Sequence, residues 1–269
     1  MDRNQEEFGL LYARLDDLAA RSAQGEVAIS PFFSPREQHF ARKYLERKGE
    51  RAIAFGGFAD AERQRLYLLP DYMEEADGES LVERLREFGW ESEISALRVC
   101  GSGYRVLSHR DFLGSLLGLG LSRSVLGDIV VSEEGDKPSA VVFCESAILP
   151  FLEAHLERVG NDKVRLARVE EEEWSSLAAE RRRTPILDTV ASERLDCVVA
   201  ALCRLSREKA RECVLSELVE LNFEKELRPD RAVEAPAILS VRGVGRFRVV
   251  SLSDRTKKGR LRLLAEKYE

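Results

Sequence analysis

Three cations surround the predicted start of a short helix: Arg207, Lys209 and Arg211. Ser206 precedes them, where its side-chain oxygen can accept a hydrogen bond from a free amide of the first helical turn. Amide groups and cationic side chains at a helix start together attract phosphate groups. The residue types and their spacing therefore predict contacts with the backbone of a nucleic acid, with Arg207 and Lys209 as the first candidates.

Two short helical patterns and a strand, within residues 192–222, position these cations. The first pattern repeats apolar residues at helical spacing, and the second directs small or apolar side chains inward. The strand ends at Asn222. We interpret Ser206 and Asn222 as turn-forming residues that also touch the backbone of the nucleic acid. The inward positions are Leu195, Val198, Val199, Leu202, Ala210, Cys213 and Val214.

The same residues resemble the S-four RNA-binding domain, which is named after ribosomal protein S-four. Three of its motifs occur at the right spacing: an R-L-D opening at 194–196, an S-R-x-x-A helix at 206–210 and a V-x-V-N type strand at 219–222. The chain has Glu217 where that family has a glycine at the end of the second helix, and Pro236-Ala237 where it has Gly-Asp. The resemblance implies an RNA-binding domain with altered turns at these two points.

The charge of the chain is unevenly distributed. The 269 residues have a formal net charge of −6. Residues 181–269 contain 20 Lys and Arg against 14 Asp and Glu, a net charge of +6, which leaves −12 for residues 1–180. A basic region attached to an acidic one favours a localised nucleic-acid surface. The acidic region should also reduce indiscriminate binding to other polyanions.

Further cations extend the predicted RNA surface. Between residues 242 and 262 the chain has eight basic residues and a single acid, Asp254, on two predicted strands around the turn at 243–245 and on a final strand. We interpret this basic hairpin as an extension of the surface made by the second helix. The additional RNA-binding candidates are Arg194, Arg211, Arg246, Lys257, Lys258 and Arg260, and the auxiliary candidates are His109, Arg110, Arg181, Arg182 and Arg183.

Two of these assignments have structural alternatives that the sequence leaves open. Arg194 could pair with Asp196 or Glu193 instead of contacting RNA. His109 and Arg110 could face RNA or have a local structural role at the start of their helix.

Residues 1–180 predict mixed helices and strands. Residues 6–21 carry an apolar helical stripe, and Ser34-Pro35 begins a second helix that stops at Gly49. Two strands follow, at 51–55 and 65–70. We interpret Arg63 and Arg65 as solvated charges at a strand end.

From residue 94 the predicted order is β-α-β-β-α-β, the ferredoxin-like order that also underlies the RRM. An RRM stacks bases on aromatic residues of its central strands. Phe143 is the single aromatic residue on those strands here, so we do not expect base stacking in the RRM manner. Asp111 is expected to cap the first helix of this order. The predicted elements are helix 79–88, strand 94–100, helix 109–119, strands 127–132 and 139–144, helix 147–158 and strand 163–169.

The motifs H-R-D-F-L-G at 109–114 and G-D-I at 127–129 resemble the signature of one bacterial S-four family, the YlmH-type proteins. Residues 56–72 and the T-K-K-G-R sequence at 256–260 resemble other parts of that family, so the resemblance covers the whole chain. It implies binding to the large ribosomal subunit that carries a stranded peptidyl-tRNA, where the S-four domain clamps rRNA and tRNA. The implied role is ribosome-associated quality control.

The sequence supports neither a metal site nor a cofactor site, and no catalytic residue is predicted. The five cysteines lie singly in apolar patterns, and the three histidines lack metal-ligand spacing. His109-Arg110-Asp111 is not a kinase motif, because Leu116 replaces the required asparagine. No strand is followed by a G-x-G-x-x-G loop. Two alternatives stay open: an RNA-modifying enzyme with an unrecognised active site in residues 1–180, and a scaffold whose basic tail binds an acidic protein.

The predicted fold class is α+β with three parts. These are an N-terminal α+β subdomain (1–76), a ferredoxin-like, RRM-like domain (77–170) and, after a linker (171–184), an S-four-type domain of the alpha-L kind (185–269). No apolar run is long enough to span a bilayer, and the start lacks a signal peptide. We expect a cytoplasmic, monomeric, non-catalytic protein that binds structured rRNA and tRNA and the large ribosomal subunit, and neither DNA nor a membrane.

Overall fold

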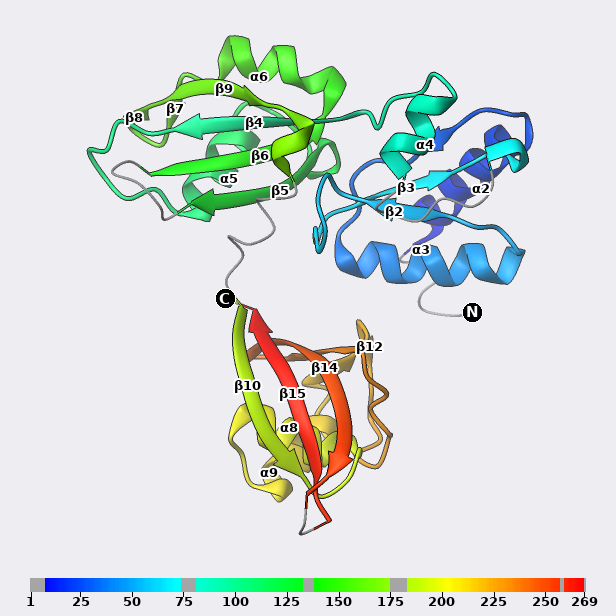
Figure 1. The fold of residues 1–269 in the computed structure, drawn as a ribbon. Coiled ribbons are helices and arrows are strands. Elements are labelled where there is room, and N and C mark those ends of the chain that lie inside the picture. The colour runs from blue at the N-terminus through cyan, green and yellow to red at the C-terminus, as the bar shows by residue number, and fades with distance from the viewer. Residues whose placement is uncertain (1–7, 74–80, 133–137, 175–182, 257–258, 269) are drawn as a thin grey trace. The chain divides into compact units, whose positions relative to one another are not determined.

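The chain folds into two compact units, residues 1–181 and 182–269. The computed structural model describes residues 8–73, 81–132, 138–174, 183–256 and 259–268 (Figure 1). Both units combine helices with antiparallel sheets, so the predicted α+β class is confirmed. Within the described ranges, no helix is both long enough and apolar enough to cross a membrane.

The first part of unit 1 is a three-stranded sheet, in the order β1-β3-β2, with two long helices. Helix α3 begins at Pro35 because Ser34 and Glu37 form a reciprocal capping box, in which the Ser34 amide donates to the Glu37 carboxylate at 2.7 Å. It ends at Gly49, which takes the left-handed conformation at φ 75°. The elements are α2 (Gly9–Ala23), β1 (Ala28–Ile29), α3 (Pro35–Lys48), β2 (Ile53–Phe55), β3 (Arg65–Leu68), η1 (Asp71–Met73) and α4 (Leu81–Glu87).

The second part of unit 1 is a four-stranded sheet in the order β5-β6-β4-β9. Its main elements follow the predicted β-α-β-β-α-β order, but the second helix, α6, stops at His155, before a short hairpin that the sequence did not predict. The elements are β4 (Ile94–Cys100), α5 (His109–Gly118), η2 (Arg123–Val125), β5 (Leu126–Ser132), β6 (Ser139–Glu145), η3 (Ser146–Ile148), α6 (Leu149–His155), β7 (Arg158–Val159), β8 (Asp162–Lys163), β9 (Arg165–Val169) and η4 (Glu171–Glu173).

The start of α5 corrects one prediction. The N-cap residue is Ser108, not Asp111. Asp111 lies three residues further on, where its carboxylate accepts hydrogen bonds from the Ser108 amide at 2.8 Å and from the Ser108 hydroxyl at 2.7 Å. These bonds and the nearby Arg105 hold the pKa of Asp111 below its usual value. A serine three residues before an acid is the usual capping-box spacing, and this spacing marks Ser108 as the cap.

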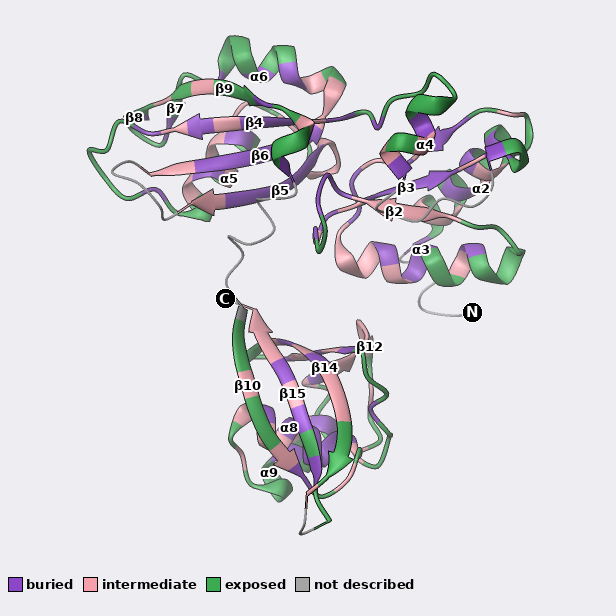
Figure 2. Ribbon diagram, viewed as in Figure 1, coloured by how far each residue is buried: buried purple, intermediate pink, exposed green. Residues whose placement is uncertain are grey.

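Strands β5, β6 and β4 of the four-stranded sheet are largely buried, as their mostly purple ribbons in Figure 2 show, whereas β9 at the edge is mostly exposed. One face packs against α5 and α6, through Phe112, Leu116 and Leu152 among others. The other face packs, around Phe143, against residues of the first part of the unit and against Trp174. Trp174 belongs to residues 171–184, which were predicted to be a linker. Phe143 is fully buried, and its ring centroid lies 5.5 Å from that of Trp174.

Two arginines join the parts of unit 1, and the prediction that Arg63 and Arg65 are solvated is wrong, because their relative exposures are only 9% and 8%. Arg63 donates from Nε to the carbonyl of Leu126 at 2.8 Å, and from Nη2 to the carbonyls of Phe32 and Arg123 at 2.9 and 2.8 Å. Arg65 donates to two further carbonyls. Buried carbonyls at element ends need such donors. These contacts hold the two sheets of unit 1 together.

Unit 2 is one six-stranded antiparallel sheet, in the order β10-β15-β14-β13-β11-β12, with both helices packed on one face. Strand β10 was missed in the sequence, and it pairs with β15 along its whole length. We call the sheet surface opposite the helices the outer face. The elements are β10 (Arg183–Val190), α8 (Leu195–Cys203), α9 (Arg207–Leu215), β11 (Val219–Leu221), β12 (Glu224–Lys225), β13 (Ala237–Val241), β14 (Gly245–Arg255) and β15 (Leu261–Tyr268).

Candidate nucleic-acid interface

The helix pair α8 and α9 forms where the sequence predicted it. The expected inward residues Leu195, Val198 and Val199 are fully buried, and so are Ala210 and Val214. Between the helices, the chain turns at a left-handed residue and enters α9 through an N-cap serine. The predicted start of the second helix is therefore confirmed.

At that start, Ser206 accepts a hydrogen bond from the Lys209 amide at 3.3 Å. Arg207 and Lys209 follow the cap and are exposed. The other amides of the first turn have no intrahelical acceptors, so they remain available to an anion. The structure thus places two predicted cations beside the amide groups that attract phosphate.

A buried carboxylate organises the cations of this region. Asp196 is 2% exposed and accepts hydrogen bonds from Nε and Nη2 of Arg194, at 3.1 and 3.0 Å. Arg207 adds a third contact from its Nε, at 3.4 Å. Burial opposes ionisation of Asp196, but the hydrogen bonds from Arg194 and Cys197 and the two arginine charges outweigh it and lower its pKa.

The pairing alternative for Arg194 is therefore observed. Its side chain is 39% exposed, but the guanidinium is engaged by Asp196, which raises its pKa. Arg207 is 60% exposed, and among the described residues its terminal amino groups have no hydrogen-bond partner. Arg194 uses its Nε and Nη2 on Asp196, whereas Arg207 uses only its Nε and is the more exposed of the two, so Arg207 presents more donors to RNA.

The cations of α9 do not share one side of the helix. Arg207 and Arg211 are four residues apart and lie one above the other, whereas Lys209 lies nearly opposite them. All three are exposed, and they flank the buried Ala210. A phosphate at the helix start can meet Arg207 and Lys209 together, while Arg211 faces a position one turn further along.

One of the two departures from the S-four pattern, Glu217, has the backbone conformation that glycine favours. Glu217 takes the left-handed conformation at φ 58°, at the position where the family has glycine. Asn222 is also left-handed, and its side-chain oxygen accepts a hydrogen bond from the Ile238 amide at 2.8 Å. Asn222 is thus a turn-forming residue, as predicted.

Arg246 and Arg248 of the basic hairpin do not lie on the same side of the sheet as α9. Phe247 and Val249 point to the helices, so the alternating Arg246 and Arg248 lie on the outer face. The Arg246 guanidinium lies 5.8 Å from the centroid of the Tyr268 ring. The strand register thus places Arg246 on the side of the sheet opposite α9, contrary to the prediction that the hairpin extends the surface of the second helix.

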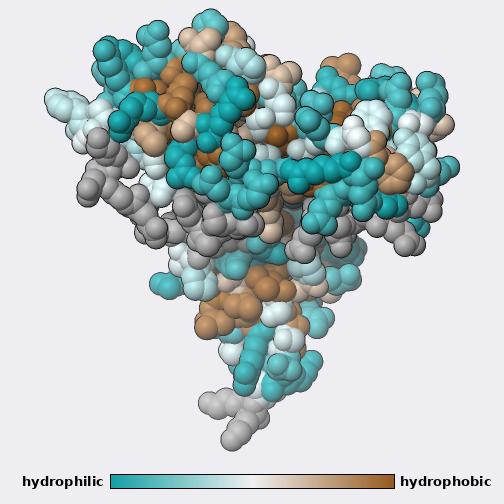
Figure 3. Space-filling model, turned by 45° about the horizontal axis from the view of Figure 1, so that its top comes forward, coloured by the Kyte–Doolittle hydropathy of each residue, from teal (hydrophilic) through white to brown (hydrophobic). Residues whose placement is uncertain are grey.

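Arg260 has a structural contact at the end of β10. Its Nε and Nη2 donate to the hydroxyl and the carbonyl of Thr189, at 2.9 and 2.6 Å. Leu187, two residues earlier on the outer face, is 80% exposed and pairs directly with Leu264. Figure 3 shows hydrophobic side chains gathered on the visible face of this unit.

The remaining candidates are only partly placed. His109 and Arg110 are exposed at the start of α5, in unit 1. Arg183 opens β10, but its side chain lies outside the described residues. The candidates Arg181, Arg182, Lys257 and Lys258 lie outside them altogether.

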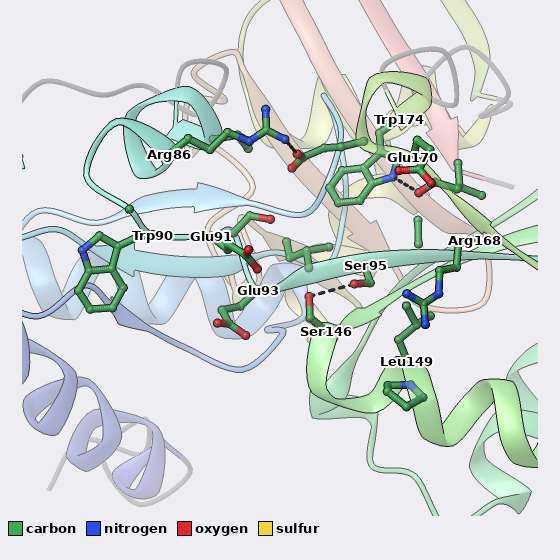
Figure 4. Close-up of a pocket in the computed structure, with 18 residues that line it drawn as sticks. Arg86, Trp90, Glu91, Glu93, Ser95, Ser146, Leu149, Arg168, Glu170 and Trp174 are labelled. Atoms are coloured by element: carbon green, nitrogen blue, oxygen red, sulfur yellow. Dashed lines mark hydrogen bonds and ion pairs between the residues drawn. The ribbon is translucent and has the colours of Figure 1, made fainter.

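Unit 1 contains a pocket of about 670 Å³ between α4 and the four-stranded sheet (Figure 4). Carboxylates of Glu91, Glu93 and Glu170 line it, and Arg86 pairs with Glu171 at its rim. Among the described residues its lining has no His, Cys or Lys, and its Ser95 and Ser146 hydroxyls hydrogen-bond to each other at 3.0 Å. No nucleophile is paired with a base among the described residues of this pocket.

Comparisons with known proteins agree with these motifs. Residues 95–173 match the family described as a putative RNA-binding domain in YlmH. The Bacillus subtilis (strain 168) protein named ribosome-associated protein quality control protein P2 is 31% identical over 249 residues, which cover 91% of this chain and 89% of that protein. The chain belongs to the YlmH family.

A solved structure is also similar to this chain. It is named cell division protein ylmH from Streptococcus pneumoniae, and it matches with a TM-score of 0.50 and 20% sequence identity. The match covers 64% of this chain and 95% of that chain. At this identity, the likeness concerns the fold.

Proposed function

We propose that this YlmH-family member is a non-catalytic protein that binds structured rRNA and tRNA on the large ribosomal subunit with peptidyl-tRNA, in quality control of stalled translation. The observation that carries the proposal is the start of α9, where exposed Arg207 and Lys209 flank free amides. The printed name of the Bacillus relative supports the ribosomal setting.

The architecture fits this proposal. We assign unit 2 to the S-four type, because its helix pair, N-cap serine and left-handed turns follow the motifs of that domain. We assign the four-stranded sheet with α5 and α6 to the ferredoxin-like type, on the basis of its strand order. In this proposal the protein acts as a monomer in the bacterial cytoplasm.

Phosphate contacts by Arg and Lys would supply most of the affinity, and the shape of the RNA most of the selectivity. Asp196 has a positioning role, since it fixes the Nε side of Arg207 and leaves the terminal amino groups to face a phosphate. Binding of this kind weakens steeply as salt rises, because each neutralised phosphate releases counterions.

An RNA-modifying enzyme is the alternative function. The pocket of Figure 4 is one candidate site for it, but its described lining has no activated nucleophile and no His, Cys or Lys to act as a base. Mass analysis of RNA from a deletion strain separates the two functions, since an enzyme would leave a modification missing.

The direct test of the proposal is sedimentation with purified large subunits across a salt series. We expect the wild-type protein to co-migrate at low salt, and the double variant Arg207→Glu/Lys209→Glu to remain at the top of the gradient. Each lost phosphate contact should reduce the salt slope by about one. Arg42→Glu/Arg47→Glu is the matched control, because it makes the same charge change on the exposed side of α3.

Wild-type protein that stays at the top of the gradient at low salt would contradict ribosome binding. Loss of binding in the α3 control as well would show that net charge, rather than the start of α9, determines association.

A further inference from the structure

The four-stranded sheet of unit 1 cannot bind bases at its centre. Phe143, its central aromatic residue, is covered by Phe58 and Trp174, with ring centroids 5.0 and 5.5 Å away. Gly57 permits this cover, because a Cβ atom there would lie 2.5 Å from the Phe143 ring. RNA that binds this domain must therefore use another surface.

The loop after β4 and the β7–β8 hairpin, at the end of the sheet to which β4 points, have the opposite charge to unit 1 as a whole. Figure 1 places β7 and β8 at this end, and Cys100, the last residue of β4, pairs with Arg165. Residues 100–111 and 158–165 together contain five Lys and Arg and two acids, in a unit whose residues 1–180 carry a net charge of −12.

Internal contacts occupy both acids. Asp162 is 6% exposed and accepts the Ser102 amide at 3.0 Å, and Asp111 pairs with Arg105 at 2.7 Å. Arg110 and Lys163 are exposed and have no ion pair with any described residue. The outward charge of these two described segments, 100–111 and 158–165, is therefore positive.

The same contacts anchor the loop 101–108 that follows β4. The Asp162 bonds fix the start of the loop, and Leu107 fixes its end, where it is 1% exposed in the core. Between these anchors, Tyr104 is 92% exposed. A tyrosine held in solvent buries no apolar area and adds nothing to the stability of the unit. Exposed aromatic rings beside cations are typical of surfaces that stack unpaired bases.

We propose that loop 101–108, the start of α5 and the β7–β8 hairpin form a second RNA-contacting surface. Tyr104 stacks on an unpaired base there, while Arg110, Lys163 and Arg165 contact the adjacent phosphates. This inference rests on the proposed RNA-binding function and assigns a part of it to unit 1. The surface selects single-stranded or looped RNA, because a base within a duplex presents no free face to the ring.

The test measures binding of the full chain to two labelled RNAs by fluorescence anisotropy: a hairpin with a loop of unpaired nucleotides, and a duplex of the same stem without a loop. Tyr104→Ala should weaken hairpin binding about tenfold and leave duplex binding unchanged. Tyr104→Phe keeps the ring and should bind like the wild type. Val106→Ala is the matched control, since Val106 is 89% exposed on the same loop and has no ring.

Wild-type affinity of Tyr104→Ala for the hairpin would overturn this inference and leave the proposed function intact. An equal loss with Tyr104→Phe would overturn the stacking role. If the wild-type protein bound neither RNA, the proposed function would fail, and this inference with it.

Discussion

Replacing Asp196 by Asn tests whether the buried carboxylate organises the start of α9. The oxygens of Asp196 accept two hydrogen bonds from Arg194 and one from Arg207. An asparagine retains one oxygen but presents an amide donor to a guanidinium donor. The variant therefore loses both the charge and at least one hydrogen bond.

The burial of the three groups sets the magnitude. Removing one partner of a fully buried ion pair costs about 3–5 kcal/mol. Here the Asp196 side chain is only 3% exposed, but those of Arg194 and Arg207 are 39% and 60% exposed. When the carboxylate is removed, water can therefore solvate part of each guanidinium. We expect unit 2 to lose about 1.5–2 kcal/mol of its free energy of unfolding.

The two units report separately in a urea titration. Both tryptophans, Trp90 and Trp174, belong to unit 1, so tryptophan fluorescence follows that unit, while far-UV circular dichroism follows both. Asp196→Asn should lower the dichroism midpoint of unit 2 by about 1 M urea, for an m-value near 2 kcal/mol/M. The fluorescence transition should not move. Asp188→Asn, which removes an exposed acid in the same unit, is the control.

The pH dependence follows from the lowered pKa of Asp196. Because the folded state favours the carboxylate, its contribution is present in full above the ordinary pKa of 3.8 and is lost as pH falls through the lower folded value. The stability difference between wild type and Asp196→Asn should therefore shrink below about pH 4. An equal midpoint for the two proteins at pH 7 would refute the role given to this carboxylate.

Two further predictions concern buried donors and a strained turn. Arg63→Met leaves three carbonyls of unit 1 without their donor and should lower the free energy of unfolding of that unit by about 3 kcal/mol. The tryptophan fluorescence transition in urea should therefore shift, while that of the control, exposed Arg42→Met, should not. An unshifted midpoint for Arg63→Met would contradict the prediction. Glu217→Gly relieves a left-handed residue at φ 58° and should stabilise unit 2 by about 0.5–1 kcal/mol, after subtraction of the half-exposed pair with Lys225. Circular dichroism of unit 2 in urea measures this gain, and Glu217→Gln gives the cost of losing the ion pair alone. If Glu217→Gly were less stable than Glu217→Gln, the backbone at this position would not be strained.

The sequence by itself determined the local structure of the candidate interface. The cap at Ser206 depends on an amide three residues away, and the buried positions of α8 and α9 follow from helical spacing. The order of the main strands and helices in residues 94–169 was predictable for the same reason, although the β7–β8 hairpin was not. Interactions that span a few residues can be recognised in a single sequence, because the chain geometry alone brings the partners together.

Only the tertiary structure decided which surfaces these elements share. Strand β10 pairs with β15 across 71 to 85 residues of sequence, and the register of β14 places Arg246 on the face opposite α9. Arg63 is buried because carbonyls from distant element ends converge around it. These contacts depend on which backbone polar groups are left without a partner and on the register of the strands. Both are determined only when the sheets assemble.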